Sequence, residues 1–136
     1  EFIHTTPDGV LDKFPLFYDN FFVPRGYAFI AAQAVGTAFS TGCPLHGGPG
    51  DVAGFKAVID WLNGRATAYT TRTGTTTMTA DWTTGKVGMM GTSYNGTIPE
   101  GVATTGVQGL EAIVPISAIS NWYDYYRANG AVRAKE

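Results

Sequence analysis

The sequence predicts an α/β fold: a mostly parallel sheet with helices on both faces. Three apolar segments have the length of strands, and three segments with helical spacing alternate with them. Strands joined through a helix run parallel and give a sheet that is covered on both sides. The 136 residues are enough for one domain and too few for two. In chain order, the expected elements are strand 26–36, helix 51–64, strand 86–90, helix 94–105, strand 110–117 and helix 121–127.

The first part of the chain predicts a loop, a short helix and a strand. Pro-Asp-Gly turn chemistry indicates a loop over 6–15. Apolar spacing from Leu16 predicts a short helix that ends at Pro24 and Gly26. The segment GYAFIAAQAVG, residues 26–36, is apolar on both faces, which is typical of a buried parallel strand.

The segment DVAGFKAVIDWLNG predicts a helix laid on the sheet. Asp51 is expected to cap its N-terminus, and Gly64 is expected to end it. The Thr-rich stretch 65–85 is expected at the surface, with a short β pairing around 75–79. The helix is indicated by apolar residues at helical spacing: Val52, Phe55, Val58, Ile59 and Leu62.

The remaining chain continues the alternation of strands and helices. Residues 86–90 predict a short strand, and 94–105 predict a helix in which Pro99 is tolerable only in the first turn. Leu110–Ser117 predicts a second buried strand, and WYDYYR predicts a short aromatic helix. The side chains of helix 94–105 that are expected to face inward are Ile98, Val102 and Ala103.

Composition excludes several classes of function. The net charge is −2 with no basic stripe, so nucleic acid is not an expected partner. No apolar run has the length of a membrane span. The lone cysteine, Cys43, precedes a proline and is expected to have a packing or loop role. Low lysine content and a Thr/Gly-rich surface favour a secreted protein, with a cytoplasmic protein as the alternative.

Ser93 lies between Gly91 and Gly96 in G-T-S-Y-N-G, with a strand expected before it and a helix after it. The nucleophile elbow of α/β-hydrolases is commonly G-x-S-x-G, so the second glycine comes one residue late. The sharp turn needs neighbours that have little side chain or tolerate positive φ; Gly91 meets this need on one side, and Asn95 is small. The backbone N–H of Tyr94 would then serve as an oxyanion donor. On this pattern alone, a serine that caps the following helix remains the alternative.

The sequence does not complete a catalytic triad. Triads of α/β-hydrolases run serine, acid, histidine along the chain, whereas His4 and His46 both precede Ser93. His46 lies in H-G-G-P-G, which is faintly similar to the oxyanion loop of lipases, and is expected to be a loop histidine. Asp124 is expected to be a polar or local hydrogen-bonding residue. No metal-ligand cluster, phosphate loop or carboxylate pair occurs, so no metal or cofactor is expected.

Longer stretches resemble the X-prolyl dipeptidyl aminopeptidases, serine peptidases with an α/β-hydrolase catalytic domain that are related to cocaine-esterase-type acyl hydrolases. The stretches are KAVIDWLNGRATAYT, ADWTTGKVGMMGTSYNGT, VATTGVQGLEAIVPISAISNWYDYYRANG and YDNFFVPRGYAFI with the glycine loop after it. The resemblance covers 17–130, and G-x-S-Y-x-G is the form of the elbow in this family. It implies a partial α/β-hydrolase fold, with 1–136 the N-terminal half of one catalytic domain.

The resemblance implies a serine exopeptidase that releases Xaa-Pro dipeptides from peptide N-termini through an acyl-enzyme. Ser93 would be the nucleophile, and Tyr94 would donate its backbone N–H to the oxyanion. Trp122 and Tyr125 match aromatic positions that line the proline pocket in the family. Flat aromatic walls suit the apolar proline ring. That WYDYYR is simply an amphipathic core helix remains the alternative for these two residues.

Departures from the family pattern leave other readings open. The acid and the histidine of the triad, and groups that hold the substrate amine, would lie outside this chain. The tyrosine side chain that serves as the second oxyanion donor cannot be assigned to Tyr18 or Tyr27. A related esterase or amidase, and a catalytically inert fragment, are therefore alternative functions. The expected partners are a peptide with proline at its second position, and the remainder of the protein or a second copy.

Overall fold

The computed structural model describes residues 18–131, which fall into two compact units divided between Gln33 and Ala34. In the first unit, α1 (Tyr18–Phe22) continues into a 3₁₀ turn, η2 (Val23–Arg25). Pro24 lies at the start of this turn, and Gly26 ends it with a φ of 83°. The predicted short helix is therefore confirmed from Tyr18 on, whereas Leu16 and the predicted loop over 6–15 lie outside the described residues.

The strand predicted over 26–36 is wrong. Residues 27–34 run without strand pairing, and a turn follows from Val35. Tyr27 and Ile30 are 63% and 42% exposed. An apolar run indicates a capacity for burial, but a strand exists only through hydrogen bonds to a neighbour. Among the described residues of the first unit there is no strand to supply that neighbour.

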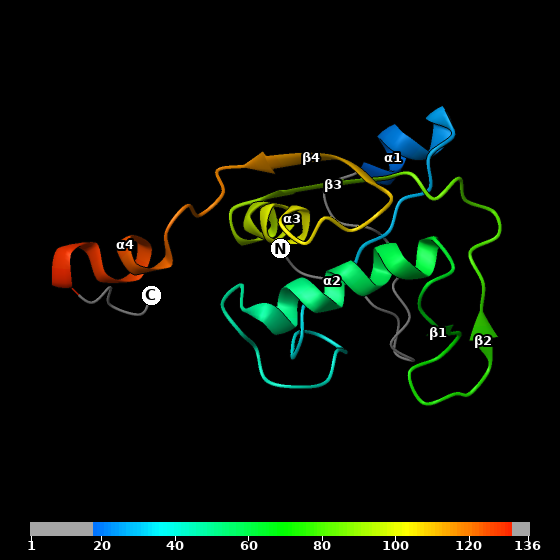
Figure 1. The fold of residues 1–136 in the computed structure, drawn as a ribbon, viewed down its shortest axis with the longest axis horizontal. Coiled ribbons are helices and arrows are strands. Elements are labelled where there is room, and N and C mark those ends of the chain that lie inside the picture. Colours follow the sequence, from blue (N-terminus) through cyan, green and yellow to red (C-terminus); the bar gives the residue numbers. More distant parts are fainter. Residues whose placement is uncertain (1–17, 132–136) are drawn as a thin grey trace. The chain divides into compact units, whose positions relative to one another are not determined.

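The second unit contains a parallel β-α-β unit. Strand β3 (Val87–Thr92) leads into α3 (Tyr94–Ala103), and β4 (Leu110–Ile116) returns parallel to β3. The register pairs Val87 with Leu110 and Thr92 with Ile116, with an irregularity after Val87. Figure 1 shows α3 lying along the two strands, with α2 beyond it. The predicted α/β class is confirmed as a mixed α/β structure that contains this unit.

Helix α2 (Pro49–Leu62) packs on α3 and completes a small core. The helix begins two residues before the predicted position, because Gly48 takes the N-cap place and Pro49 supplies a φ suited to the first turn. The prediction that Asp51 caps it is therefore wrong. Gly64, with a φ of 71°, follows the end of the helix as predicted. The buried core residues are Ile59, Ile98, Val102 and Val107, with Val52, Phe55, Val87, Met89, Tyr94 and Leu110 packed against them.

The burial pattern corrects three expectations. Ala103 is exposed, although it was expected to face inward, because α3 ends there. Pro99 lies inside α3 beyond the first turn, and the missing N–H frees the Asn95 carbonyl, which lies against Gly91. The expected burial of β4 is also wrong: Val114 and Ile116 are 50% and 41% exposed. Within the described residues α3 covers one face of the sheet, and no helix covers these two side chains.

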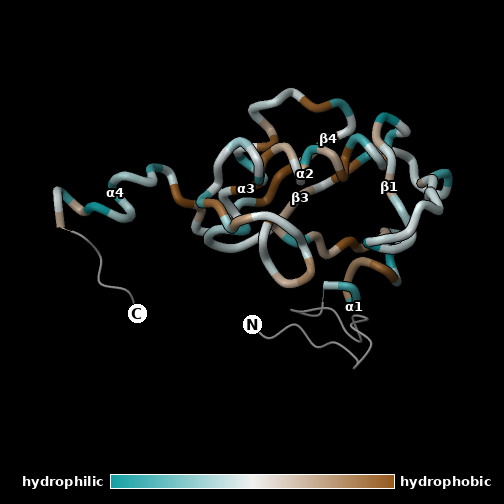
Figure 2. The backbone as a smooth tube through the Cα atoms, turned by 90° about the horizontal axis from the view of Figure 1, so that it is seen from below, coloured by the Kyte–Doolittle hydropathy of each residue, from teal (hydrophilic) through white to brown (hydrophobic). Residues whose placement is uncertain are grey.

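Two peripheral elements match the predictions. The Thr-rich stretch forms a short antiparallel pair, β1 (Ala68–Tyr69) with β2 (Thr77–Met78). The aromatic segment forms α4 (Trp122–Arg127), followed by a 3₁₀ turn, η3 (Ala128–Gly130). In Figure 2 hydrophobic segments occur in β3 and α2, whereas α4 is pale to teal, because its tryptophan and tyrosines are weakly hydrophilic on that scale and its aspartate and arginine strongly so.

Candidate functional site

Ser93 occupies the turn between β3 and α3 in a strained backbone conformation. Its φ and ψ are 61° and −122°, which a residue with a side chain rarely adopts. Both sides of the residue are fixed by backbone hydrogen bonds. Its N–H donates to the Ile116 carbonyl at 2.8 Å, and its carbonyl accepts from the N–H groups of Gly96 and Thr97 at 2.9 and 3.0 Å. The turn is therefore held by β4 and by the first turn of α3 together.

Two glycines make this tight turn possible. A Cβ at Gly96 would lie 2.8 Å from the carbonyl oxygens of both Gly91 and Ile116. A Cβ at Gly91 would overlap the backbone of Asn95. Neither position tolerates a side chain, because helix and strand meet there through their backbones. The sequence spacing G-x-S-x-x-G thus has a direct steric cause.

The Ser93 side chain is presented on the surface, at the N-terminus of α3. The residue is exposed, and within the described part of the chain its hydroxyl makes no hydrogen bond. Tyr94 is the first residue of α3, so its N–H has no acceptor within the helix. A hydroxyl next to such an N–H is the arrangement that acyl transfer needs, because the N–H can bind the developing oxyanion.

The Tyr94 side chain reaches back to the loop before α2. Its hydroxyl lies 2.6 Å from Asp51 Oδ2 and 3.1 Å from the Leu45 carbonyl, and it accepts from the Gly47 N–H at 3.1 Å. The Gly47 N–H also donates to Asp51 Oδ2, at 3.2 Å. Burial of the ring, and then the hydrogen bond to Asp51, raise the pKa of Tyr94 above its ordinary value of 10.0.

An aromatic cluster lies beside this loop. Trp122 stacks on Tyr126 with an interplanar angle of 12°, and its ring centroid is 5.9 Å from that of Tyr94. The Tyr126 hydroxyl lies 3.3 Å from His46 Nδ1. A Cβ on Gly47 would approach the Trp122 ring to 2.8 Å, so the loop backbone and the indole are in close contact.

The start of α4 is anchored to the same corner. The Thr97 hydroxyl donates to the Ser93 carbonyl at 3.1 Å and accepts from the Ile119 N–H at 2.8 Å. Asn121 then caps α4, because its Oδ1 accepts from the N–H of Tyr123 at 2.9 Å. These bonds link the turn at Ser93 to the helix that carries Trp122.

The structure brings most of the predicted site residues together. Tyr94 adjoins Ser93 and contacts Trp122, and Tyr125 joins through Trp122, with ring centroids 6.2 Å apart. Tyr125 is 40% exposed. Sequence reasoning did not predict the place of three residues in this network: Asp51, His46 and Tyr126. An aspartate at a helix start is typical of a cap, so nothing in the pattern distinguished Asp51 from one.

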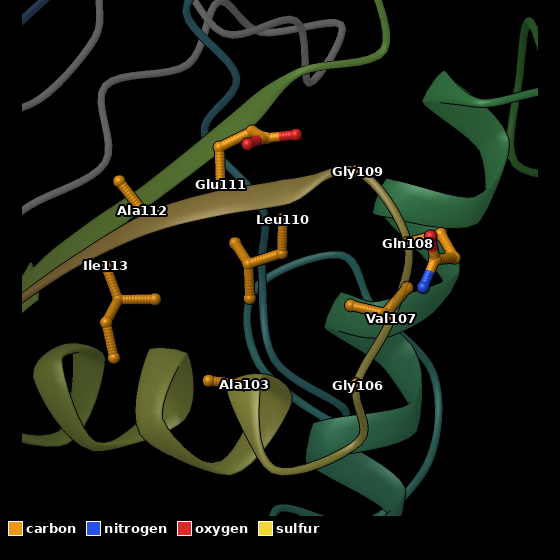
Figure 3. Close-up of a pocket in the computed structure, with 9 residues that line it drawn as sticks. All are labelled: Ala103, Gly106, Val107, Gln108, Gly109, Leu110, Glu111, Ala112 and Ile113. Atoms are coloured by element: carbon orange, nitrogen blue, oxygen red, sulfur yellow. The ribbon is translucent and has the colours of Figure 1, made fainter.

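Other candidates lie elsewhere. Cys43 is an exposed free thiol, Asp124 is exposed, and His4 lies outside the described residues. A hollow of about 390 Å³ lies along the start of β4. Its lining includes Val107 and Leu110 (Figure 3). It lies at the amino end of the strand, whereas sites in parallel sheets lie at the carboxyl ends, where Ser93 is. Within 18–131, no helix is long and apolar enough to span a membrane, and no three acidic, His or Cys side chains gather as metal ligands.

The steric account of the turn predicts opposite effects for two glycine substitutions. Gly91→Ala should destabilise the fold by about 1–3 kcal/mol, because the new methyl group overlaps the Asn95 backbone. Gly54→Ala, inside α2, meets only Val35 at 4.0 Å and should stabilise by about 0.4–1 kcal/mol. Urea unfolding measures both. Equal stability of the two variants would contradict the close approach of α3 to β3.

The Asp51–Tyr94 bond predicts a change in the titration of Tyr94. Asp51→Asn removes the charge and weakens the acceptor, so the pKa of Tyr94 should fall towards its ordinary value. Because the folded pKa is raised, this bond contributes its full stability below pH 10 and loses it as the pH rises through the folded pKa. Titration of ¹³Cζ-tyrosine by NMR, with Tyr94→Phe to assign the signal, measures the shift. An unchanged pKa in Asp51→Asn would refute the bond.

Comparison with known proteins relates the chain to a single family. The family model described as X-Pro dipeptidyl-peptidase (S15 family) matches residues 4–136. Proteins provisionally named Xaa-Pro dipeptidyl-peptidase from Streptomyces avermitilis and Bacillus anthracis are 60% and 59% identical over 91% and 86% of this chain. One from Rhodopirellula baltica is 51% identical over 82%. These alignments cover 18%, 19% and 18% of the respective relatives, so the chain spans about a fifth of their length. The chain belongs to the X-Pro dipeptidyl-peptidase (S15) family.

Proposed function

We propose that this chain carries the nucleophile of a serine exopeptidase that releases Xaa-Pro dipeptides from peptide N-termini. In this proposal residues 1–136 are part of one α/β-hydrolase catalytic domain, whose mostly parallel sheet is covered on both faces in the whole protein. The observation that carries the proposal is the φ of 61° at Ser93, on a strand-to-helix turn that only glycines can flank. Family membership supports the Xaa-Pro substrate class.

The reaction begins when Ser93 Oγ attacks the carbonyl carbon of the proline at the second position. The Ser93 proton passes to a base, and the tetrahedral oxyanion receives a hydrogen bond from the Tyr94 N–H. Collapse breaks the bond to the amine of the third residue, which leaves with a proton and yields an acyl-enzyme. Water then releases the Xaa-Pro dipeptide and restores Ser93. Because no histidine follows Ser93 in the sequence, the base comes from the remainder of the protein.

In the same proposal Trp122 and Tyr125 line the pocket for the proline ring. Their rings stand nearly perpendicular, at 87°, and could contact two sides of a flat apolar ring. Trp122 is half-buried, so one part of the indole packs inward while the rest remains available. Contact between the rings of Trp122 and Tyr94 brings this wall next to the proposed nucleophile.

Two other functions are compatible with the same turn. A related esterase or amidase would use Ser93 in the same way on another acyl group, and an inert chain would present Ser93 without a base. The exposed hydroxyl at the start of α3 favours an enzyme over an inert chain, because a strained conformation usually persists where function requires it.

Ser93→Ala in the full-length protein should abolish hydrolysis of Ala-Pro p-nitroanilide, with kcat reduced by about 10⁴-fold or more. The matched control is Ser120→Ala, an exposed serine beyond β4, which should retain wild-type activity. A panel of Ala-Pro anilide against short acyl esters identifies the substrate. Turnover of esters alone by the wild type would reject the peptidase in favour of the esterase, and an active Ser93→Ala would reject the nucleophile.

Trp122→Ala should raise the KM for Ala-Pro p-nitroanilide about tenfold or more, because the proline ring loses an apolar wall. Trp122→Phe should restore much of the affinity, since it keeps a flat ring. Tyr123→Ala, on the same helix but 63% exposed, is the control. Steady-state kinetics on Ala-Pro and Ala-Ala anilides separates a pocket from a packing role. An equal loss for both substrates would show that the indole does not recognise proline.

A further inference from the structure

Asp51 is a buried charged residue that the proposed mechanism does not use. It is 0% exposed, in the first turn of α2. Acidic side chains are seldom fully buried without partners, because loss of hydration is costly. Its Oδ1 has no hydrogen-bond partner among the described residues, whereas its Oδ2 accepts from Tyr94 and Gly47. The two hydrogen bonds of this carboxylate therefore converge on one oxygen.

The Tyr94 hydroxyl can donate only one hydrogen bond, and its distances to the two acceptors show which bond that is. The Tyr94 hydroxyl carries one proton, and two acceptors lie within reach of it: Asp51 Oδ2 at 2.6 Å and the Leu45 carbonyl at 3.1 Å. The shorter bond to the carboxylate takes the proton, because charge-assisted hydrogen bonds are stronger. A lone pair of the hydroxyl then accepts from the Gly47 N–H. Tyr94, Asp51 and Gly47 are thus joined in a ring of three hydrogen bonds.

We propose that Asp51 is a positioning residue for hydrolysis: by holding the Tyr94 hydroxyl, it fixes the Ser93–Tyr94 peptide, whose N–H binds the oxyanion. This inference rests on the proposed role of Ser93. The hydroxyl oxygen of a tyrosine lies on the axis of its χ2 rotation, so a hydrogen bond there restrains χ1, and contact with the Trp122 ring restrains χ2. The ring in turn restrains the backbone of Tyr94, which is the first residue of α3.

The Asp51 carboxylate is also linked, through Gly47, to Trp122 in the proposed proline pocket. Its second donor, Gly47, has a φ of 69° and packs against the Trp122 indole. Asp51 thus holds one loop that contacts Trp122 and one ring that adjoins Ser93. Asp51 is therefore one link that sets the distance between the oxyanion donor and the pocket wall, beside the Thr97 bonds that reach α4.

The test uses the full-length protein and two kinds of inhibitor. Ala-boroPro forms a tetrahedral adduct with the serine and depends on the oxyanion donor, whereas alanyl-pyrrolidine, which keeps the five-membered ring but has no carboxyl group, does not. Asp51→Asn and Tyr94→Phe should each lower kcat, and the affinity for Ala-boroPro, by about ten- to a hundredfold. This loss is smaller than the roughly hundred- to thousandfold loss of kcat that follows removal of an oxyanion donor itself. Binding of alanyl-pyrrolidine should change less than twofold. The double variant should be no worse than the more impaired single variant, because both changes act on the same bond.

The matched control is Asp60→Asn, on the same helix, where the carboxylate pairs with Lys56 and Arg65 at the surface. It should retain wild-type kinetics. Tyr94→Phe carries the test if Asp51→Asn does not fold. Equal losses of affinity for Ala-boroPro and alanyl-pyrrolidine, additive losses in the double variant, or an unchanged kcat would each overturn the inference.

The outcomes distinguish this inference from the proposed function. If the wild type hydrolyses only esters, the peptidase proposal fails, and the same kcat comparison on that ester still tests Asp51. If the wild type cleaves Ala-Pro anilide and both variants match it, the peptidase proposal stands and Asp51 has no positioning role. A wild type without any hydrolase activity overturns both.

Discussion

The close approach of α3 to β3 is the constraint on which the rest of the site depends. Helix and strand touch through backbone at Gly91 and Gly96, and the chain must reverse between them within a few residues. Ser93 takes the positive φ that this reversal requires. The strain is sustained because the turn bonds to β4 through Ile116 and to α3 through its own carbonyl. Sterics thus place a hydroxyl on the surface next to the unpaired N–H of a helix start.

The other elements contribute by holding the surroundings of that turn. Burial of Ile59 and Val102 joins α2 to α3, and each such side chain is worth about 1.5–3 kcal/mol. With α2 fixed, Asp51 is hydrogen-bonded to the Tyr94 hydroxyl, and the loop at Gly47 lies against Trp122. The proposed nucleophile, oxyanion donor and pocket wall are therefore tied to one small core. Whether Asp51 positions the Ser93–Tyr94 peptide can therefore be tested separately from its contribution to the stability of the fold.

The features that the sequence predicted correctly are those that depend on interactions between residues close together in the chain. The glycines around Ser93 and the glycine after α2 each act within a few residues, and the turn before α3 and the end of α2 formed as expected. Long-range partners were not predictable. The run 26–36 is apolar enough for a strand, yet pairing depends on a neighbour that the run itself does not specify. Asp51 has the pattern of a helix cap, and only the fold shows that it meets Tyr94, 43 residues along the chain.

The most direct measurement is a crystal structure of the full-length protein after reaction with a fluorophosphonate. The account predicts phosphorus bonded to Ser93 Oγ, with Ser93 still at a φ near 61°. The phosphoryl oxygen should lie about 2.7–3.1 Å from the Tyr94 nitrogen. Phosphorus on another side chain, an ordinary negative φ at Ser93, or a phosphoryl oxygen turned away from α3 would contradict it.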